Sequence, residues 1–288
     1  MVFNRLETLN GLTVVESDSL EKKLNERVAP FLDRWVFGSQ WANVWGDAAV
    51  LNFQNYATDL NGCKTALKGC DSVNFIDVVD NGIMELMNRI SIKALDQINN
   101  IAVRNRNRVH AYYPFLWVWH RLDDERWKYS SVPMRTGRKH RGKLEVDHTI
   151  ADAWWKRLIN KEIETKLATF SGTEEDRVLV APDGFESRDE AFSFINSLGN
   201  CSLLNKSFNI SKSDEPMWKF LQEVHEFKEG TIKRDDWEKA MSLSETLTSP
   251  DGATLVEVKD AIEKRDALIR GDLRDFVSGN KHRVDVVG

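Results

Sequence analysis

The sequence predicts an α+β protein that is predominantly helical, with an N-terminal helical domain followed by a small module of two strands and a helix. Three observations predict this class. Apolar residues recur at helical spacing through most of the first 130 residues, the short segment 144–148 alternates as a strand does, and a second strand pattern follows at 201–204. The chain has 288 residues, which is enough for one large domain or two of ordinary size.

The first half of the chain is expected to be helical. Apolar residues at three-and-four spacing predict helices over 20–51 and 75–109. A further helix is expected over 112–120, entered at Pro114, because proline suits the first turn of a helix. The segment 131–143 contains proline, two glycines and a dense basic cluster, which is typical of a loop or hinge. We therefore expect a helical domain over 21–130 and a second domain over 131–288.

The second half mixes strands and helices. The segment 144–148 (LEVDH) is read as a strand that ends at the polar pair Asp147–His148, and 201–204 as its partner. The segment 170–188 is expected to be loop-rich. Helices are expected over 150–167, over 189–198 with Gly199 closing it, from about 211 with Pro216 in the first turn, and over 254–276.

Composition excludes several classes of protein. No apolar run is long enough to span a bilayer and no signal-peptide pattern opens the chain, so we expect a cytoplasmic protein without a membrane partner. The three cysteines, Cys63, Cys70 and Cys201, form no CxxC pair, which argues against a disulfide framework or a structural zinc site. The net charge of −5 means that any nucleic-acid binding depends on local basic surfaces.

Three segments carry the candidate chemistry: 144–148, 198–205 and 207–212. Their order is a strand ending in Asp-His, a strand with asparagine, and an asparagine opening a helix, which is a ββα-metal arrangement. Phosphodiester hydrolysis needs a base and a cation that offsets charge at phosphorus. Asp147 and Asn209 supply oxygen ligands for one Mg²⁺ or Mn²⁺ ion, and His148 is the candidate base. Because neighbouring strand residues face opposite ways, a local break is needed to aim both at one phosphate.

These segments resemble the HNH nuclease superfamily, in particular the C-terminal HNH domain of GmrSD-type modification-dependent restriction enzymes. The matching motifs are His-Thr-Ile-Ala at 148–151, Gly-Asn-Cys-Ser-Leu-Leu at 199–204 and Asn-Ile-Ser-Lys at 209–212. The resemblance implies that His148 is the general base, that Asn200 orients the histidine loop and that Asn209 is a metal ligand. It also implies that Lys212 contacts the phosphate. Ala151 stands where the family usually has proline.

The resemblance also implies a function and partners. The fold would be an HNH module embedded in helices, and the activity a metal-dependent endonuclease that nicks or cuts both strands of DNA, modified or not, in restriction or anti-phage defence. Residues 1–20 resemble the joint to a companion NTP-dependent domain, so they would be a joint or remnant of it, and such a domain or subunit is an expected partner. Two other functions remain open: a non-catalytic DNA-binding or regulatory module with a decayed HNH scaffold, or an RNase using the same site.

Alternative interpretations remain for several of these residues. Asn200 follows a glycine and could cap a helix or turn a loop, Asn209 could be a helix N-cap, and Asn205 is a rival for its role. A basic cluster precedes the strand and is either a phosphate-binding surface or a solvated loop. Its members expected to bind nucleic acid are Arg135, Arg138, Lys139, Arg141 and Lys143, and a second candidate group is Arg104, Arg106 and Arg108.

Overall fold

The computed structural model describes residues 94–96, 98, 99, 112–130, 144–206, 209, 212, 217 and 233–281. The chain forms two compact units: residues 1–99 with 274–282, and residues 100–273 with 283–288. The predicted helices before residue 94 and both groups of basic residues, 104–108 and 135–143, lie outside the described residues. Within the first unit, residues 94–96, 98 and 99 are helical, and Ala94 and Ile98 are buried.

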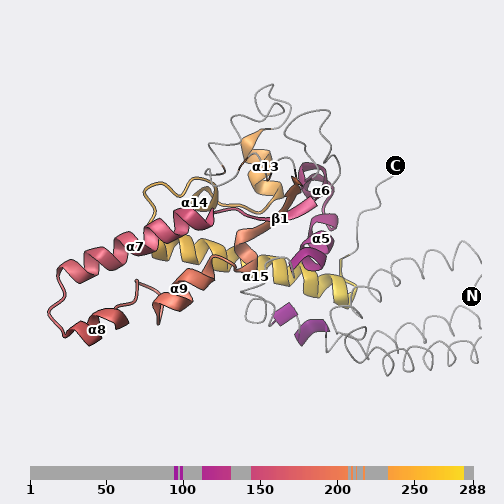
Figure 1. Ribbon diagram of the computed structural model, residues 1–288. Coiled ribbons are helices and arrows are strands. Elements are labelled where there is room, and N and C mark those ends of the chain that lie inside the picture. Colours follow the sequence, from indigo (N-terminus) through magenta and orange to yellow (C-terminus); the bar gives the residue numbers. More distant parts are fainter. Residues whose placement is uncertain are drawn as a thin grey trace, which may run out of the picture. The chain divides into compact units, whose positions relative to one another are not determined.

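The described part is mostly helical and contains one two-stranded antiparallel sheet, which confirms the α+β class (Figure 1). Among the described residues, no helix combines the length and the apolar character needed to cross a membrane. The elements are α5 (Tyr113–Arg121), α6 (Asp124–Ser130), β1 (Leu144–His148), α7 (Asp152–Ala168), α8 (Glu174–Leu179), α9 (Arg188–Phe194), the 3-10 turn η2 (Leu198–Asn200), β2 (Cys201–Asn205), α13 (Arg234–Ala240), α14 (Glu245–Thr248) and α15 (Leu255–Ser278).

The two strands pair as the sequence predicts. Leu144 lies opposite Asn205, and His148 lies opposite Cys201. Every residue of β2 is buried, because α5 and α6 pack against it. These helices belong to the same compact unit as the strands.

Several helices begin where the sequence provides caps. The Thr173 hydroxyl accepts a hydrogen bond from the backbone of Asp176, whose carboxylate accepts one in return, so α8 begins with a capping box. Thr254 and Glu257 exchange the same pair of hydrogen bonds before α15. The expected helix over 254–276 is confirmed, and that over 150–167 begins at Asp152.

Other sequence-based expectations need correction. The segment 170–188 is mostly irregular, as expected, and contains the short helix α8, whereas α13 and α14 were not anticipated. Lys206 and Asn209 are helical, so helical structure appears before residue 211. Asn209 is itself helical, whereas an N-cap residue has a non-helical backbone. Gly199 belongs to the 3-10 turn, and α9 ends earlier, at Phe194.

The core of the second unit forms where α7, α9 and α15 meet. Trp155 is fully buried, stacks on Phe194 at 6.0 Å between ring centroids, and donates a hydrogen bond from its indole to the Ala191 carbonyl. Ile159 and Ile262 pack in the same cluster. Burying side chains of this size contributes about 1.5–3 kcal/mol each, and Leu204 of β2 belongs to the same cluster.

Gly199 permits a close approach between the turn η2 and α15. A Cβ at this position would lie 2.0 Å from the Ile262 carbonyl oxygen and 2.8 Å from the Asp266 amide nitrogen. One turn further along α15, the buried Arg265 guanidinium donates to the carbonyls of Gly199 and Cys201 at 2.7 and 2.9 Å and to the Ser202 hydroxyl at 2.8 Å. The backbone that leads into β2 is therefore fastened to α15.

His120 supports β2 from the other side as a neutral ring. Its Nε2 accepts a hydrogen bond from the Leu203 amide at 3.2 Å, so the proton is on Nδ1, which faces the Ser130 hydroxyl. Burial lowers the pKa of His120 well below 6.5, and the nearby charges of Arg126 and Arg265 lower it further. Protonation would remove the acceptor and place a cation between two guanidinium groups.

This arrangement predicts acid sensitivity of the fold. The pKa of His120 is lower in the folded chain than in the unfolded chain, so its contribution to stability is present above pH 6.5 and is lost as the pH falls below that value. The free energy of unfolding, measured by urea titration between pH 7.5 and 5, should fall by up to about 1.4 kcal/mol per pH unit from this residue. His120→Gln should show a shallower slope. Equal slopes in both proteins would contradict the assignment.

Candidate active site

His148 occupies the end of β1, where its ring is held by an asparagine that precedes η2. The Nε2 atom lies 2.9 Å from the Asn196 side-chain oxygen. Because that oxygen can only accept, Nε2 carries the proton and Nδ1 of the neutral ring is left as an acceptor. The Asn196 backbone carbonyl in turn accepts a hydrogen bond at 2.8 Å from the hydroxyl of the buried Tyr112. The ring is thus oriented through two successive contacts.

Asn200 holds the backbone that follows His148. Its side-chain oxygen accepts from the Ile150 amide at 2.9 Å, and its amide group donates to the carbonyls of Ile150 and Ile195 at 3.1 and 2.9 Å. The Asn200 carbonyl also accepts from the Thr149 amide at 2.7 Å. Asn200 is fully buried. These contacts are structural in kind, because they hold the backbone at residues 149, 150 and 195.

Asp147 and Lys212 form an ion pair on the other side of β1. The two charged groups lie 3.1 Å apart, and the side chains are 12% and 1% exposed. Lys212 also donates to the His148 backbone carbonyl at 3.0 Å. One ammonium therefore ties together both residues of the Asp-His pair. Contact of Lys212 with a phosphate, as the resemblance implies, stays a prediction and would require it to leave these buried partners.

Asn209 lies near Glu145, and Glu145 is two residues before Asp147 in β1. The Asn209 amide group donates to the Glu145 carboxylate at 3.2 Å, and the same carboxylate forms an ion pair with Lys206 at 2.5 Å. Lys206 and Asn209 thus contact Glu145, and Lys212 contacts Asp147. No hydrogen bond joins the His148 ring to Asn209 among the described residues, so the structure brings Asn209 to the carboxylate side of β1.

Burial shifts the pKa values of Asp147 and His148 in opposite directions, and nearby charges partly offset both shifts. Burial raises the pKa of Asp147, and the Lys212 ammonium partly offsets this shift. Burial also lowers the pKa of His148, while the Asp147 charge and the hydrogen bond to Asn196 act against it. His148 is therefore neutral at pH 7, which is the form that can accept a proton.

The oxygen atoms on the carboxylate side of β1 are of the type that a hard cation prefers. Mg²⁺ keeps several waters and accepts only one or two protein carboxylates, so Asp147 with the Asn209 side-chain oxygen would suffice. The Asp147 Oδ2 atom is buried, and the Lys212 ammonium lies 3.1 Å from it. Among the described residues, no three acidic, histidine or cysteine side chains gather into a metal site. A cation at Asp147 would have to compete with the Lys212 ammonium, and the expected metal site stays a prediction.

Sequence reasoning missed two residues of this site. Asn196 could not be assigned because it contacts His148 across 48 positions and belongs to no motif. Glu145 did carry a signal, since strand alternation places it on the same face as Asp147. Asn205, considered as a rival to Asn209, is buried in β2 opposite Leu144.

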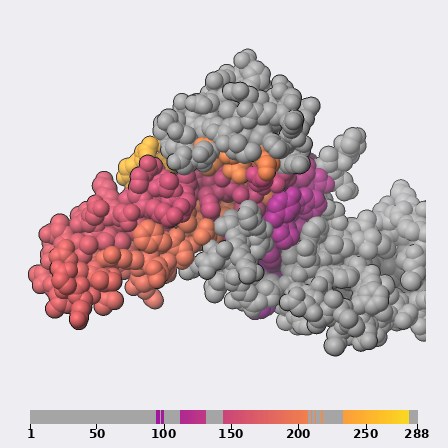
Figure 2. Space-filling model, in the orientation of Figure 1, coloured from indigo at the N-terminus to yellow at the C-terminus, as the bar shows by residue number. Residues whose placement is uncertain are grey.

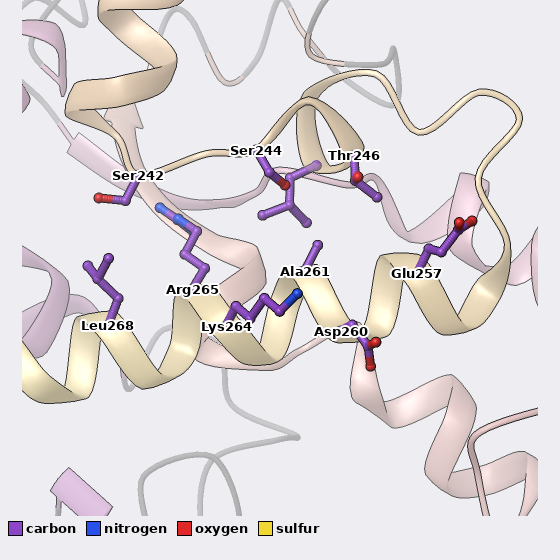
Figure 3. Close-up of a pocket in the computed structure, with 10 residues that line it drawn as sticks. Ser242, Ser244, Thr246, Glu257, Asp260, Ala261, Lys264, Arg265 and Leu268 are labelled. Atoms are coloured by element: carbon purple, nitrogen blue, oxygen red, sulfur yellow. The ribbon is translucent and has the colours of Figure 1, made fainter.

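A hollow of about 370 Å³ lies apart from the Asp-His pair, between α14 and α15. Figure 3 shows Ser244 and Thr246 on one side of it and Glu257, Asp260 and Lys264 on the other. Its only member with a link to the strands is Arg265, whose hydrogen bonds are to the protein itself. None of the candidate catalytic residues lines this hollow.

The contacts of Asn200 predict a large effect of its removal. Asn200→Ala would leave the buried Ile150 amide and two carbonyls without their partners, and each such group costs about 1–3 kcal/mol. We expect a loss of about 3 kcal/mol or more in the free energy of unfolding, measured by urea titration. Asn196→Ala is the matched control and should lose much less, since its side chain bonds only the half-buried His148 ring. Equal losses would contradict the role assigned to Asn200.

Comparison with known proteins adds no name to this geometry. No family model, no curated protein and no solved structure matches the chain. The interpretation of the site therefore depends on its own residues: an oriented imidazole at the end of β1, a buried turn held by Asn200, and two carboxylates facing the helix that carries Asn209.

Proposed function

We propose that this chain is a metal-dependent nuclease that hydrolyses phosphodiester bonds with His148 as the general base. The observation that carries the proposal is the contact of 2.9 Å between His148 Nε2 and the Asn196 side-chain oxygen. Asn196 holds Nε2, which leaves Nδ1 able to take a proton from water. A neutral imidazole and oxygen ligands for a hard cation are the groups that phosphodiester hydrolysis needs, and a local break at the end of β1 would bring the His148 ring to the side that carries Asp147 and Asn209.

Each residue has a distinct part in this proposal. Asp147 and Asn209 would hold one divalent cation, Mg²⁺ or Mn²⁺, and Glu145 keeps the Asn209 amide oriented. A bound cation would supply the positive charge that stabilises the phosphorus centre and the leaving oxygen. Lys212 is a positioning residue, since it contacts Asp147 and the His148 backbone and not the reacting atoms.

The resemblance to the HNH domain of GmrSD-type enzymes extends the proposal. It supports DNA as the substrate, restriction or anti-phage defence as the process, and an NTP-dependent companion domain or subunit as a partner. An RNase and a non-catalytic DNA-binding module are the competing functions. Parallel incubation with supercoiled plasmid, linear duplex and RNA, with Mg²⁺ or Mn²⁺ and with EDTA as control, distinguishes the three.

Loss of the imidazole tests the proposed base. His148→Ala should cleave on the order of 10²–10⁴-fold more slowly, the usual contribution of a positioned general base. Added imidazole should restore part of the rate, because it replaces only the missing proton acceptor. The cleavage rate of Asn196→Ala should lie between those of His148→Ala and the wild type, since the His148 ring remains but is no longer oriented. Full activity of purified His148→Ala, with EDTA still inhibiting, would place the site elsewhere.

Loss of the amide oxygen tests the proposed cation ligand. Asn209→Ala should lose cleavage at low Mg²⁺ and regain part of it as the cation concentration rises, because one of few protein ligands is gone. Thermal unfolding should change little, since Asn209 is only half-buried. Glu145→Gln is the matched control, because it retains an acceptor for the Asn209 amide and should keep the cation dependence of the wild type. Unchanged cation dependence in Asn209→Ala would remove it from the mechanism.

A further inference from the structure

A second hollow lies along α7, which begins four residues after His148. Its volume is about 330 Å³, and it is lined by Trp154, Arg157, Leu158 and Lys161 of α7 and by the segment 251–253. Residues at these α7 positions share one face of a helix. In Figure 2 the side chains of α7 form part of the molecular surface. The hollow therefore lies next in the chain to the candidate active site.

Two cations in this hollow have no neutralising partner. Arg157 and Lys161 are exposed, and within the described part of the chain their side chains form neither a salt bridge nor a hydrogen bond. Other lysines of α7 are neutralised: Lys156 pairs with Asp152 at 2.5 Å, and Lys166 with Asp183 at 2.6 Å. Like charges four residues apart on a helix repel one another, so an anion between them would be stabilised.

Trp154 adds an aromatic surface to these cations. It packs in part against the core cluster and remains partly exposed at the hollow. Bases of single-stranded nucleic acid stack on such side chains while basic residues hold the backbone. Asp251 on the opposite wall forms no salt bridge with Arg157 or Lys161, and its carboxylate would repel phosphate from that wall. Phosphates are therefore directed to the α7 side.

We infer that this hollow binds an unstacked nucleotide of the nucleic-acid substrate, with its base on Trp154 and the adjoining phosphates on Arg157 and Lys161. The inference rests on the proposed nuclease function and names a binding surface for its nucleic-acid substrate. An unstacked base is available in single strands and at distorted positions of a duplex. Single-stranded nucleic acid should therefore bind more tightly than the matching duplex.

Binding measured in EDTA tests this surface without cleavage. The probe is a fluorescently labelled single-stranded DNA, and the readout is anisotropy at several salt concentrations. The double variant Arg157→Gln/Lys161→Gln should bind on the order of tenfold more weakly. Its slope of log affinity against log salt should fall by about 1.4, since each phosphate contact contributes about 0.7 on single strands. Lys156→Gln is the matched control on the same helix and should bind within about twofold of the wild type, because that lysine is already paired.

Two further variants test the stacking. Trp154→Leu should weaken binding about fivefold or more with the salt slope unchanged, while Trp154→Phe should retain most of the affinity. Circular dichroism checks that both variants fold, and if Trp154→Leu does not, the Phe variant and the double variant decide. Wild-type affinity and salt slope in the double variant would overturn the inference. Competition by a free mononucleotide as strong as that by the oligonucleotide would also overturn it, because the hollow would then be a site for small nucleotides.

The outcomes separate this inference from the proposed function. A wild type that binds the oligonucleotide at this surface but never cleaves with Mg²⁺ or Mn²⁺ would leave the surface in place and remove the nuclease. If the wild type cleaves and the α7 variants bind as the wild type does, the nuclease function stands and the proposed binding surface on α7 is wrong. His148→Ala should bind as the wild type does, because the imidazole is not part of the hollow.

Discussion

The attachment of β2 to α15 is the constraint on which the rest of the second unit depends. It combines a steric condition with a polar one. At Gly199 the backbone passes so close to α15 that a Cβ would lie 2.0 Å from the Ile262 carbonyl oxygen. At Arg265 a buried guanidinium donates to the carbonyls of Gly199 and Cys201 and to the Met241 carbonyl. Burial lowers the pKa of Arg265 to about 9, so it keeps its charge at neutral pH, and its hydrogen bonds compensate the lost hydration.

Asn200 connects this attachment to the backbone that follows His148. The residue lies between the two carbonyls that Arg265 holds, and its side chain fixes the Ile150 backbone just after His148. His148 is therefore oriented by packing that begins in α15, although no side chain of α15 is among its hydrogen-bond partners in the described residues. Arrangements of this kind hold a proton acceptor in place before substrate arrives, which reduces the reorganisation needed during the reaction.

The buried ion pair of Asp147 and Lys212 stabilises the fold and also occupies the carboxylate that the proposed cation would bind. Removal of either partner would leave an uncompensated buried charge, which typically costs 3–5 kcal/mol. The same ammonium lies where a divalent cation would compete for the Asp147 carboxylate. In the proposed reaction, affinity for the cation is therefore weak until a substrate phosphate adds its own oxygen ligands. Specificity for nucleic acid would then come from surfaces outside the pair, such as the face of α7 that carries Trp154.

The sequence by itself determined the local features: the alternating strand that ends at His148, its partner strand with Asn200 just before it, and the long helix that ends the described part. Each depends on periodicity or on residues close in the chain. Only the tertiary structure decided that Asn196 holds the His148 ring and that Lys212 is buried on Asp147, because these contacts join residues 48 and 65 positions apart. Short amphipathic helices such as α13 and α14 were missed for the same reason. Their apolar residues are too few to give a periodic signal, and packing against the rest of the unit stabilises them.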